Sequence, residues 1–301
     1  MIRAIRSLRE EFSRRGAEVF CPEMQQILSV EELLQLVPQY DGWIIGDDPA
    51  TAQVFQAGRA GRLRAAVKWG AGTDNVDFAG AAACGYKVVN TPGTFGEEVS
   101  DVALAYLIGL ARDLFFVDRE VRTGRWPKPP GTSLQGKTVG VVGYGHIGRA
   151  LVRKLNALGT AVVVYDPVVS AASVDGATLA QWPEKLGELD FLVLACALTE
   201  KNKHMLDADA FGRMRQGIRI INVSRGGLIN QAALLHALES GLVVGAALEV
   251  LEEEPPRSDE PLLKHPHCIF GSHNSSNTSE AVLRTSMTAI ELLFERLSGA
   301  R

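Results

Sequence analysis

The sequence predicts an α/β protein built from two doubly wound domains with parallel sheets. Apolar runs of strand length alternate with segments of helical periodicity along almost the whole chain, a pattern typical of parallel sheets covered by helices. One of these strand-to-helix connections contains a cluster of glycines. The chain has 301 residues, 46% of them hydrophobic, and this length favours two hydrophobic cores over one.

A glycine turn near the middle of the chain is the clearest motif. Lys137–Val142 is a β-branched apolar run that predicts a buried strand, and an amphipathic segment ending near Leu158 predicts a helix. Between them, Gly143 permits a tight turn, Gly145 lets the backbone approach a pyrophosphate, and Gly148 allows close packing of helix and strand. The N–H groups at the helix N-terminus favour an anion. We therefore expect a dinucleotide site, although such turns also occur without a ligand.

An acidic residue at the end of the next predicted strand indicates which nucleotide binds. Ala161–Tyr165 predicts the strand, and Asp166 follows it, 18 residues beyond Gly148. A carboxylate at this place accepts hydrogen bonds from the ribose hydroxyls of adenosine and repels a 2′-phosphate. Residues 167–169 supply no cation for that phosphate. The motif therefore predicts NAD rather than NADP.

The first third of the chain predicts a smaller parallel sheet. Residues 1–15 are charged and helix-like, and Ala17–Cys21 could form a short strand. Because a domain of this kind normally begins with a strand, we expect that a first strand upstream of Met1 is missing. Further strands are predicted at Gly42–Gly46, Leu63–Trp69 and Tyr86–Asn90, with helices near 30–36, 50–57 and 76–83.

Two glycine-rich turns follow strands in this part of the chain. They are the segments Gly70–Asn75 and Asn90–Gly93. Small residues after Trp69 would let backbone N–H groups face an anion such as a substrate carboxylate. An ordinary tight turn explains the same residues equally well, so both readings stay open.

A long, largely apolar helix is predicted at Glu97–Val117. It is too hydrophobic for a surface element, so it should be buried between the domains or against a second subunit. Trp126–Gly136 is a Pro/Gly-rich connection to the glycine-turn strand. Beyond Asp166 the alternation continues, with strands predicted near Leu189–Cys196, Ile218–Ser224, Val243–Val250 and Cys268–His273, and helices near 207–214, 230–240 and Ser279–Leu297.

Three ionisable residues follow predicted strands of this second sheet. Arg225 follows Ser224, Glu254 lies four residues beyond Val250, and His273 ends the last predicted strand. Open parallel sheets place their ligands at these carboxyl ends. Each alone has a simpler explanation, as a solvated cation, a surface glutamate or a loop histidine. Together, beside a dinucleotide motif, a cation, a carboxylate and an imidazole predict a hydride-transfer site.

Composition excludes several classes of partner. The net charge is −4 with no basic block, so neither nucleic acid nor an anionic membrane is an expected partner. The four cysteines form no CxxC pair and no metal-binding spacing, which is typical of reduced thiols in a cytoplasmic protein. The longest apolar run, Val102–Ala111, is too short to span a bilayer, and we expect no metal.

Six longer motifs are spread over nearly the whole chain. They are GAGTDNVD (70–77), VVNTPGT (88–94), LQGKTVGVVGYGHIGRA (134–150), INVSRGGLIN (221–230), GAALEVLEEEPP (245–256) and GSHNSSNT (271–278). With these motifs the sequence resembles the NAD-dependent D-2-hydroxyacid dehydrogenases, in particular their D-3-phosphoglycerate dehydrogenase-like branch.

The resemblance implies a role for each candidate site residue. In that family the Arg of the SRGG motif binds the substrate carboxylate and keto oxygen, and the Glu before Pro pairs with the catalytic His. These roles fall on Arg225, Glu254 and His273. Cofactor contacts are implied at Gly143, Gly145, His146, Ile147, Gly148, Asp166, Cys196, Val223 and Glu249. Substrate contacts are implied at Lys68, Gly70, Ala71, Gly72 and Asn75.

The implied architecture is a Rossmann NAD-binding domain at 96–278 and a flavodoxin-like substrate domain at 1–95 with 279–301, with the active cleft between them. The implied activity is hydride transfer between NAD(H) and C2 of a small D-2-hydroxy or 2-oxo acid, with 3-phosphoglycerate as one candidate. The alternatives are an NADH-sensing binding protein of the corepressor type, and a dehydrogenase of another small anion such as glyoxylate, formate or phosphite. A cytoplasmic homodimer built on the helix near 97–117 is also implied.

The chain departs from the family pattern at some positions. Glu249 stands where an Asp is usual, so its longer side chain could alter the nicotinamide contact. Ala195 and Ala197 replace the usual His and Pro, which loosens the adenosine pocket. The expected absence of a first strand would be the largest departure, because loss of a central strand would weaken the substrate domain.

Overall fold

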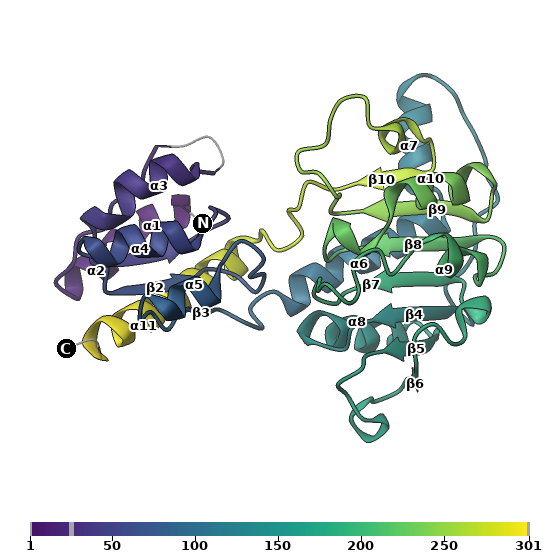
Figure 1. Ribbon diagram of the computed structural model, residues 1–301. Coiled ribbons are helices and arrows are strands. Elements are labelled where there is room, and N and C mark those ends of the chain that lie inside the picture. Colours follow the sequence, from purple (N-terminus) through teal and green to yellow (C-terminus); the bar gives the residue numbers. More distant parts are fainter. Residues whose placement is uncertain (1, 24–26, 300–301) are drawn as a thin grey trace. The chain divides into compact units, whose positions relative to one another are not determined.

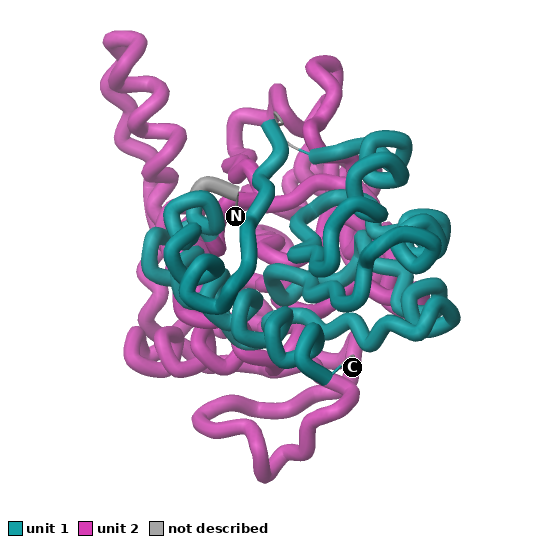
Figure 2. The backbone as a smooth tube through the Cα atoms, turned by 90° about the vertical axis from the view of Figure 1, so that its left-hand side faces the viewer, with its two compact units in different colours: residues 1–94, 277–301 teal, residues 95–276 magenta. Residues whose placement is uncertain are grey.

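The computed structural model describes residues 2–23 and 27–299 (Figure 1). The chain divides into two units: unit 1 is residues 1–94 with 277–301, and unit 2 is residues 95–276 (Figure 2). Both contain parallel sheets covered by helices, which confirms the predicted fold class.

Unit 2 contains a sheet of seven parallel strands in the order β10-β9-β8-β7-β4-β5-β6. The first strand along the chain, β4, lies between β5 and β7, so the strand order reverses beside it. The strands are β4 (Thr138–Val142), β5 (Ala161–Tyr165), β6 (Thr178–Ala180), β7 (Phe191–Leu194), β8 (Ile218–Asn222), β9 (Val243–Leu248) and β10 (Cys268–Phe270). The helices are α6 (Gly96–Ala111), α7 (Leu114–Arg122), α8 (His146–Ala157), α9 (Ala208–Gly212) and α10 (Gln231–Glu239), with 3₁₀ turns at Ala171–Ser173, Leu186–Glu188, Gly226–Leu228 and Pro261–Lys264.

Helices cover both faces of this sheet because its strands are apolar on both sides. Leu192 and Ile220 lie in one core with Leu234 of α10. Val193, the residue after Leu192 on β7, is equally buried but lies on the other face of the sheet. That face is covered by α6, which contacts β8, β9 and α8. The continuous apolar runs seen in the sequence are therefore strands buried on both faces.

Unit 1 contains a sheet of only three parallel strands in the order β1-β2-β3. One face packs against α11, whose Ala289 and Leu293 contact Val67 of β2. The other face carries Ile45 and Ala66, which pack with Phe55 of α4. The elements are α1 (Ile2–Ser7), α2 (Arg9–Arg14), α3 (Val30–Leu36), a 3₁₀ turn (Val37–Gln39), β1 (Gly42–Ile45), α4 (Ala52–Ala60), β2 (Ala65–Lys68), α5 (Phe78–Ala83), β3 (Val89–Asn90) and α11 (Ser279–Gly299).

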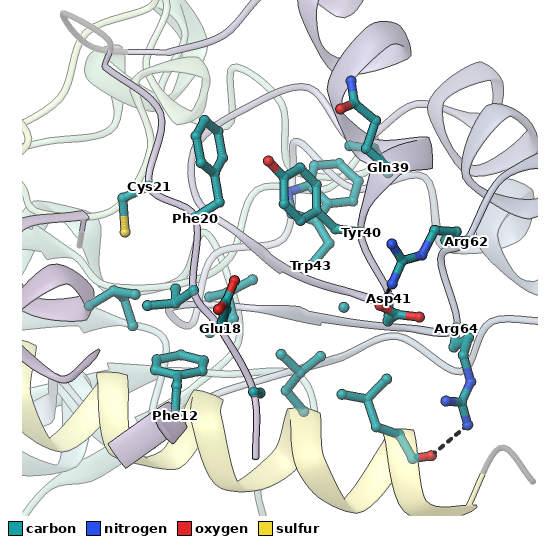
Figure 3. Close-up of a pocket in the computed structure, with 18 of the residues that line it drawn as sticks. Phe12, Glu18, Phe20, Cys21, Gln39, Tyr40, Asp41, Trp43, Arg62 and Arg64 are labelled. Carbon is teal, nitrogen blue, oxygen red and sulfur yellow. Dashed lines mark hydrogen bonds and ion pairs between the residues drawn. The ribbon is translucent and has the colours of Figure 1, made fainter. Parts of the chain in front are cut away.

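A groove of about 880 Å³ runs along the outer edge of β1 (Figure 3). Among the described residues, β1 pairs only with β2. The carbonyl oxygens of Asp41 and Ile45 face β2, so the alternation of a parallel ladder turns the N–H and C=O groups of Gly42 and Ile44 towards the groove. Residues 17–21 also line it. Within the described residues, the sheet of unit 1 thus ends at an edge without a neighbouring strand.

Three sequence predictions differ from the structure. Ala17–Cys21 forms no strand, because no described strand lies next to it to complete a ladder. The predicted helix at Glu97–Val117 is interrupted where Asp113 adopts a left-handed conformation with φ 50°. Met1, the first residue of the predicted N-terminal helix, lies outside the described residues, and that helix is divided into α1 and α2.

The two halves of the predicted long helix have different surroundings. The buried face of α6 packs within its own unit against α8, β8 and β9. By contrast, α7 has no buried residue, and Leu114, Phe115 and Val121 are 51%, 41% and 40% exposed. Within the described part of the chain, none of the helices has the length and hydrophobicity needed to cross a membrane.

Candidate functional site

The glycine turn connects β4 to α8 at the carboxyl edge of the unit 2 sheet. Gly143 has a φ of 96°, and a Cβ there would lie within 2.8 Å of Ala195 O and Cys196. A Cβ at Gly148 would overlap Gly143 O, so close packing requires both glycines. Around Gly145 the space is open. The backbone can therefore be approached closely at the N-terminus of a twelve-residue helix, as binding of a pyrophosphate requires.

Asp166 lies beside this turn at the end of β5. Its carboxylate accepts from the backbone N–H groups of Tyr144 at 2.8 Å and Val168 at 2.9 Å. These bonds fix the orientation of the carboxylate, and each oxygen keeps a further lone pair for a ribose hydroxyl. The open turn and this acceptor fit the adenosine end of NAD. His146, which is exposed, and Ile147, which is half-buried, begin α8 and lie at the same edge.

Cys196 and Val223 follow the adjacent strands β7 and β8. Cys196 is half-buried, and burial raises the pKa of its thiol to about 11. The thiol is therefore neutral and lines the site rather than acting as a nucleophile. Val223 is 5% exposed. The hydroxyl of Ser224 donates to Cys196 O and joins the two strand ends. The structure therefore places both residues at the edge where the glycine turn lies.

An imidazole–carboxylate pair lies at the far end of the same edge. Nδ1 of His273, beyond β10, is 2.7 Å from Oε2 of Glu254, and the other oxygen of Glu254 accepts from Leu251 N–H at 2.9 Å. Burial by itself would raise the pKa of Glu254, but its hydrogen bonds to His273 and Leu251 and the charges of His273 and Arg225 hold it below its ordinary value. The His273 side chain is 48% exposed, so its ring remains accessible to a substrate.

Arg225 follows β8 and begins the next 3₁₀ turn. Its Nη1 donates to Ser224 O at 2.8 Å, and its own carbonyl accepts from Asn222 Nδ2 at 2.8 Å. The charge of Arg225 lies close enough to lower the pKa of Glu254. The cation, the carboxylate and the imidazole predicted from the sequence are thus neighbours within unit 2.

Glu249, a predicted cofactor contact, lies directly after β9 at the carboxyl edge of the sheet. It is 3% exposed, and Tyr106 of α6 donates to its Oε2 at 2.5 Å. Sequence reasoning missed Tyr106. The sequence did contain a signal for it, a tyrosine on the apolar face of a predicted helix. Such a residue indicates a polar partner, because a buried phenol hydroxyl needs one.

The predicted substrate residues lie in unit 1, at the carboxyl ends of β1 and β2. Lys68 is 3% exposed, and its ammonium group donates to Gly46 O at 2.7 Å and Trp69 O at 2.9 Å. Asn75 Nδ2 also donates to Gly46 O, at 2.9 Å. Both side chains therefore hold the backbone at these strand ends.

The turn after β2 offers fewer donors than the sequence suggested. Gly70 has a φ of 103°, and its N–H donates to Thr91 Oγ1 at 2.7 Å. The carbonyl of Ala71 accepts from Asn90 Nδ2 at 3.0 Å. The N–H of Gly70 is therefore already used, and a carboxylate at this turn would rely on Ala71 and Gly72.

The seven-stranded sheet with its glycine turn and ribose acceptor defines a Rossmann dinucleotide-binding protein. Within that class the chain belongs to the D-isomer specific 2-hydroxyacid dehydrogenases, because residues 104–275 match the family described as the NAD binding domain of these enzymes. The resemblance inferred from the sequence is thereby confirmed, and so is NAD as the cofactor of the family domain.

Individual relatives support this assignment. The chain is 32% identical over 291 residues to D-3-phosphoglycerate dehydrogenase of Archaeoglobus fulgidus, covering 95% of this chain and 54% of that protein. It is 31% identical over 280 residues to hydroxypyruvate reductase of Thermotoga maritima, covering 90% and 89%. The crystal structure of the TT0316 protein of Thermus thermophilus superposes with a TM-score of 0.90 at 30% identity, covering 99% and 94%. The chain spans about half the length of the D-3-phosphoglycerate dehydrogenases that it matches.

Proposed function

We propose that this protein transfers a hydride between NAD(H) and C2 of a small D-2-hydroxy or 2-oxo acid. The observation that carries the proposal is the 2.7 Å contact between His273 Nδ1 and Glu254 Oε2, at the same sheet edge as the glycine turn. A hydride-transfer site needs a group that exchanges a proton with the substrate oxygen, and a carboxylate-paired imidazole is suited to that.

Each member of the triad has a separate task. The glycine turn and Asp166 would hold NADH, which would supply the hydride. In reduction the imidazolium of His273 donates its Nε2 proton to the C2 oxygen, while Glu254 stabilises the charged ring through Nδ1. In oxidation the neutral ring accepts the hydroxyl proton. Arg225 binds the substrate carboxylate in a two-pronged geometry that a lysine could not reproduce.

The direct test is His273→Gln, which preserves size and polarity but cannot carry the proton. We expect kcat to fall about 10²- to 10⁴-fold, while the affinity for NADH, measured by fluorescence titration, stays unchanged. His236→Gln, an exposed histidine on α10, is the matched control. Turnover close to that of the wild type in His273→Gln would remove His273 from the mechanism.

The substrate is proposed only as a class. The relatives named above are called D-3-phosphoglycerate dehydrogenase and hydroxypyruvate reductase, so both acids belong in the test. We propose that unit 1 is the substrate-binding part and that Lys68 there orders its own loops rather than a phosphate, because its ammonium group is buried against two carbonyls. A panel of 2-oxo acids, glyoxylate and phosphorylated acids included, should be run with NADH and NADPH. Tight NADH binding without turnover of any acid would indicate the sensor alternative.

We propose that the protein is a homodimer and that α7 forms part of its interface. Leu114, Phe115 and Val121 leave an exposed apolar surface on a nine-residue helix. Leu114→Glu should convert a dimer to a monomer in analytical ultracentrifugation, whereas Leu158→Glu, at an exposed leucine after α8, should not. A cytoplasmic location is proposed from the four free cysteines.

A further inference from the structure

The carboxylate of Glu249 is surrounded by three donors although it is almost fully buried. Its Oε1 accepts from the backbone N–H groups of Asn274 at 2.5 Å and Ser275 at 2.8 Å. Its Oε2 accepts from the hydroxyl of Tyr106 at 2.5 Å. A buried carboxylate is tolerated only with such partners. Both oxygens of Glu249 are therefore used within the protein.

Tyr106 is a permanent hydrogen-bond donor to the Glu249 carboxylate. It is 7% exposed on α6, and burial, together with its hydrogen bond to Glu249, raises the pKa of its phenol well above the ordinary value. The phenol therefore keeps its proton throughout the physiological pH range. A Cβ at position 271 would overlap Glu249 Oε2 and crowd the Tyr106 hydroxyl, so Gly271 is needed there.

These contacts hold the chain on both sides of His273. Its own N–H donates to Glu249 O at 2.9 Å, and the N–H of Gly271 donates to Leu248 O at 2.9 Å. Immediately after His273 in the chain, the N–H groups of Asn274 and Ser275 donate to the Glu249 carboxylate. His273 itself has a φ of 54°, a left-handed conformation that a residue with a side chain adopts only when its surroundings enforce it.

We infer that Glu249 and Tyr106 are positioning residues that hold the segment 271–275 and so keep the imidazole of His273 in place for proton transfer. This inference rests on the proposed function, because it assigns the pair a task in that reaction. It gives Glu249 a task other than the nicotinamide contact expected from the resemblance. An aspartate is one methylene shorter and would not span from the end of β9 to Tyr106 and the 274–275 backbone together.

Tyr106→Phe is the principal test because it removes one hydroxyl and little volume. Without its donor, Oε2 of Glu249 is left unsatisfied, and we expect kcat to fall about tenfold. The affinity for NADH should change less than about twofold, since the pair contacts the loop and not the cofactor. Hydrogen exchange of the amides of Asn274 and Ser275 should accelerate about tenfold in the protein without cofactor. Tyr86→Phe, which removes a similarly buried hydroxyl that donates to Leu63 O at 3.0 Å, should alter neither quantity.

Glu249→Gln is the second variant, and it should produce the same pattern more strongly because an amide cannot accept from all three donors. Unchanged exchange at residues 274 and 275 in Tyr106→Phe would overturn the inference. Weaker NADH binding with an unchanged kcat would also overturn it, because that result belongs to a cofactor contact. If the wild-type protein reduces no 2-oxo acid, the proposed function fails, whereas the exchange measurement still reports whether the pair holds the loop.

Discussion

The two sheets of this protein differ in how completely their strands are paired. In unit 2 the inner strand β4 has neighbours on both sides, and strands of three to six residues continue the sheet in each direction. In unit 1 the sheet has three strands of two to four residues, and β1 faces a groove. An apolar, strand-like sequence is therefore not sufficient to form a strand, because a strand also needs a neighbour to pair with. Ala17–Cys21 has the composition of a strand, but no described neighbour completes its ladder.

The largest effect is expected from a cavity in the complete sheet. Phe191 is fully buried at the start of β7, with β4 and β8 on either side. Phe191→Ala should reduce the free energy of unfolding of unit 2 by about 3–5 kcal/mol, because the surrounding strands cannot collapse into the space. Hydrogen exchange with mass spectrometry reports each unit separately and would measure it. A loss below about 2 kcal/mol would mean that this sheet is less rigid than its pairing suggests.

A smaller effect is expected from the matching change beside the groove. Phe12 of α2 is 4% exposed, lines the groove and packs 6.1 Å from the ring of Phe294. Phe12→Ala enlarges a space that already exists, so only the transfer contribution of about 2 kcal/mol is lost from unit 1. The same exchange experiment applies. A cost equal to that of Phe191→Ala would show that unit 1 is packed as tightly as unit 2.

The buried cation of unit 1 should matter for stability and not for substrate choice. In Lys68→Met the carbonyls of Gly46 and Trp69 lose a donor and Asp47 loses an ion pair of 3.5 Å, but the cost of burying a charge also disappears. We expect unit 1 to lose about 1 kcal/mol. The ratio of kcat/KM for phosphorylated and unphosphorylated 2-oxo acids should stay the same, and a selective loss with phosphorylated acids would restore Lys68 as a phosphate ligand.

The smallest effect concerns the charge of Glu254 in unit 2. Because its pKa is lowered in the folded protein, its ionised form stabilises the fold above the unfolded-state pKa of about 4.3, and this contribution is lost as the pH falls through the lowered value. The melting temperature of Glu254→Gln should therefore lie slightly below that of the wild type at pH 7, and the difference should vanish in strong acid. A difference that grows on acidification would contradict this sign.

The particular elements show how far sequence reasoning reached. The glycine turn and the strands of unit 2 were predictable because β-branched runs buried on both faces leave a continuous apolar signal. The strand Thr178–Ala180 was missed because three residues at a sheet edge carry too short a pattern. The break at Asp113 was missed because a single left-handed residue inside an apolar run changes no periodicity.

The site residues divide in the same way, into those with a local sequence signal and those brought together only by packing. Arg225, Glu254 and His273 could be named because each follows a predicted strand, where parallel sheets place their ligands. The partnership of Glu249 with Tyr106 could not, because 143 residues separate the two along the chain and only packing brings them together. Similarly, a lysine at a strand end looks solvated in a sequence, and only the structure shows the carbonyls around Lys68.

The open edge of β1 has a practical consequence for handling this protein. Backbone groups without a neighbouring strand are a template on which another polypeptide can add in β conformation. Charged side chains discourage such addition, and here Arg62 and Asp41 form an ion pair of 2.6 Å at the groove. High salt weakens exposed ion pairs of this kind, so concentrated, salt-rich stocks should form fibrous precipitate sooner than dilute, low-salt ones.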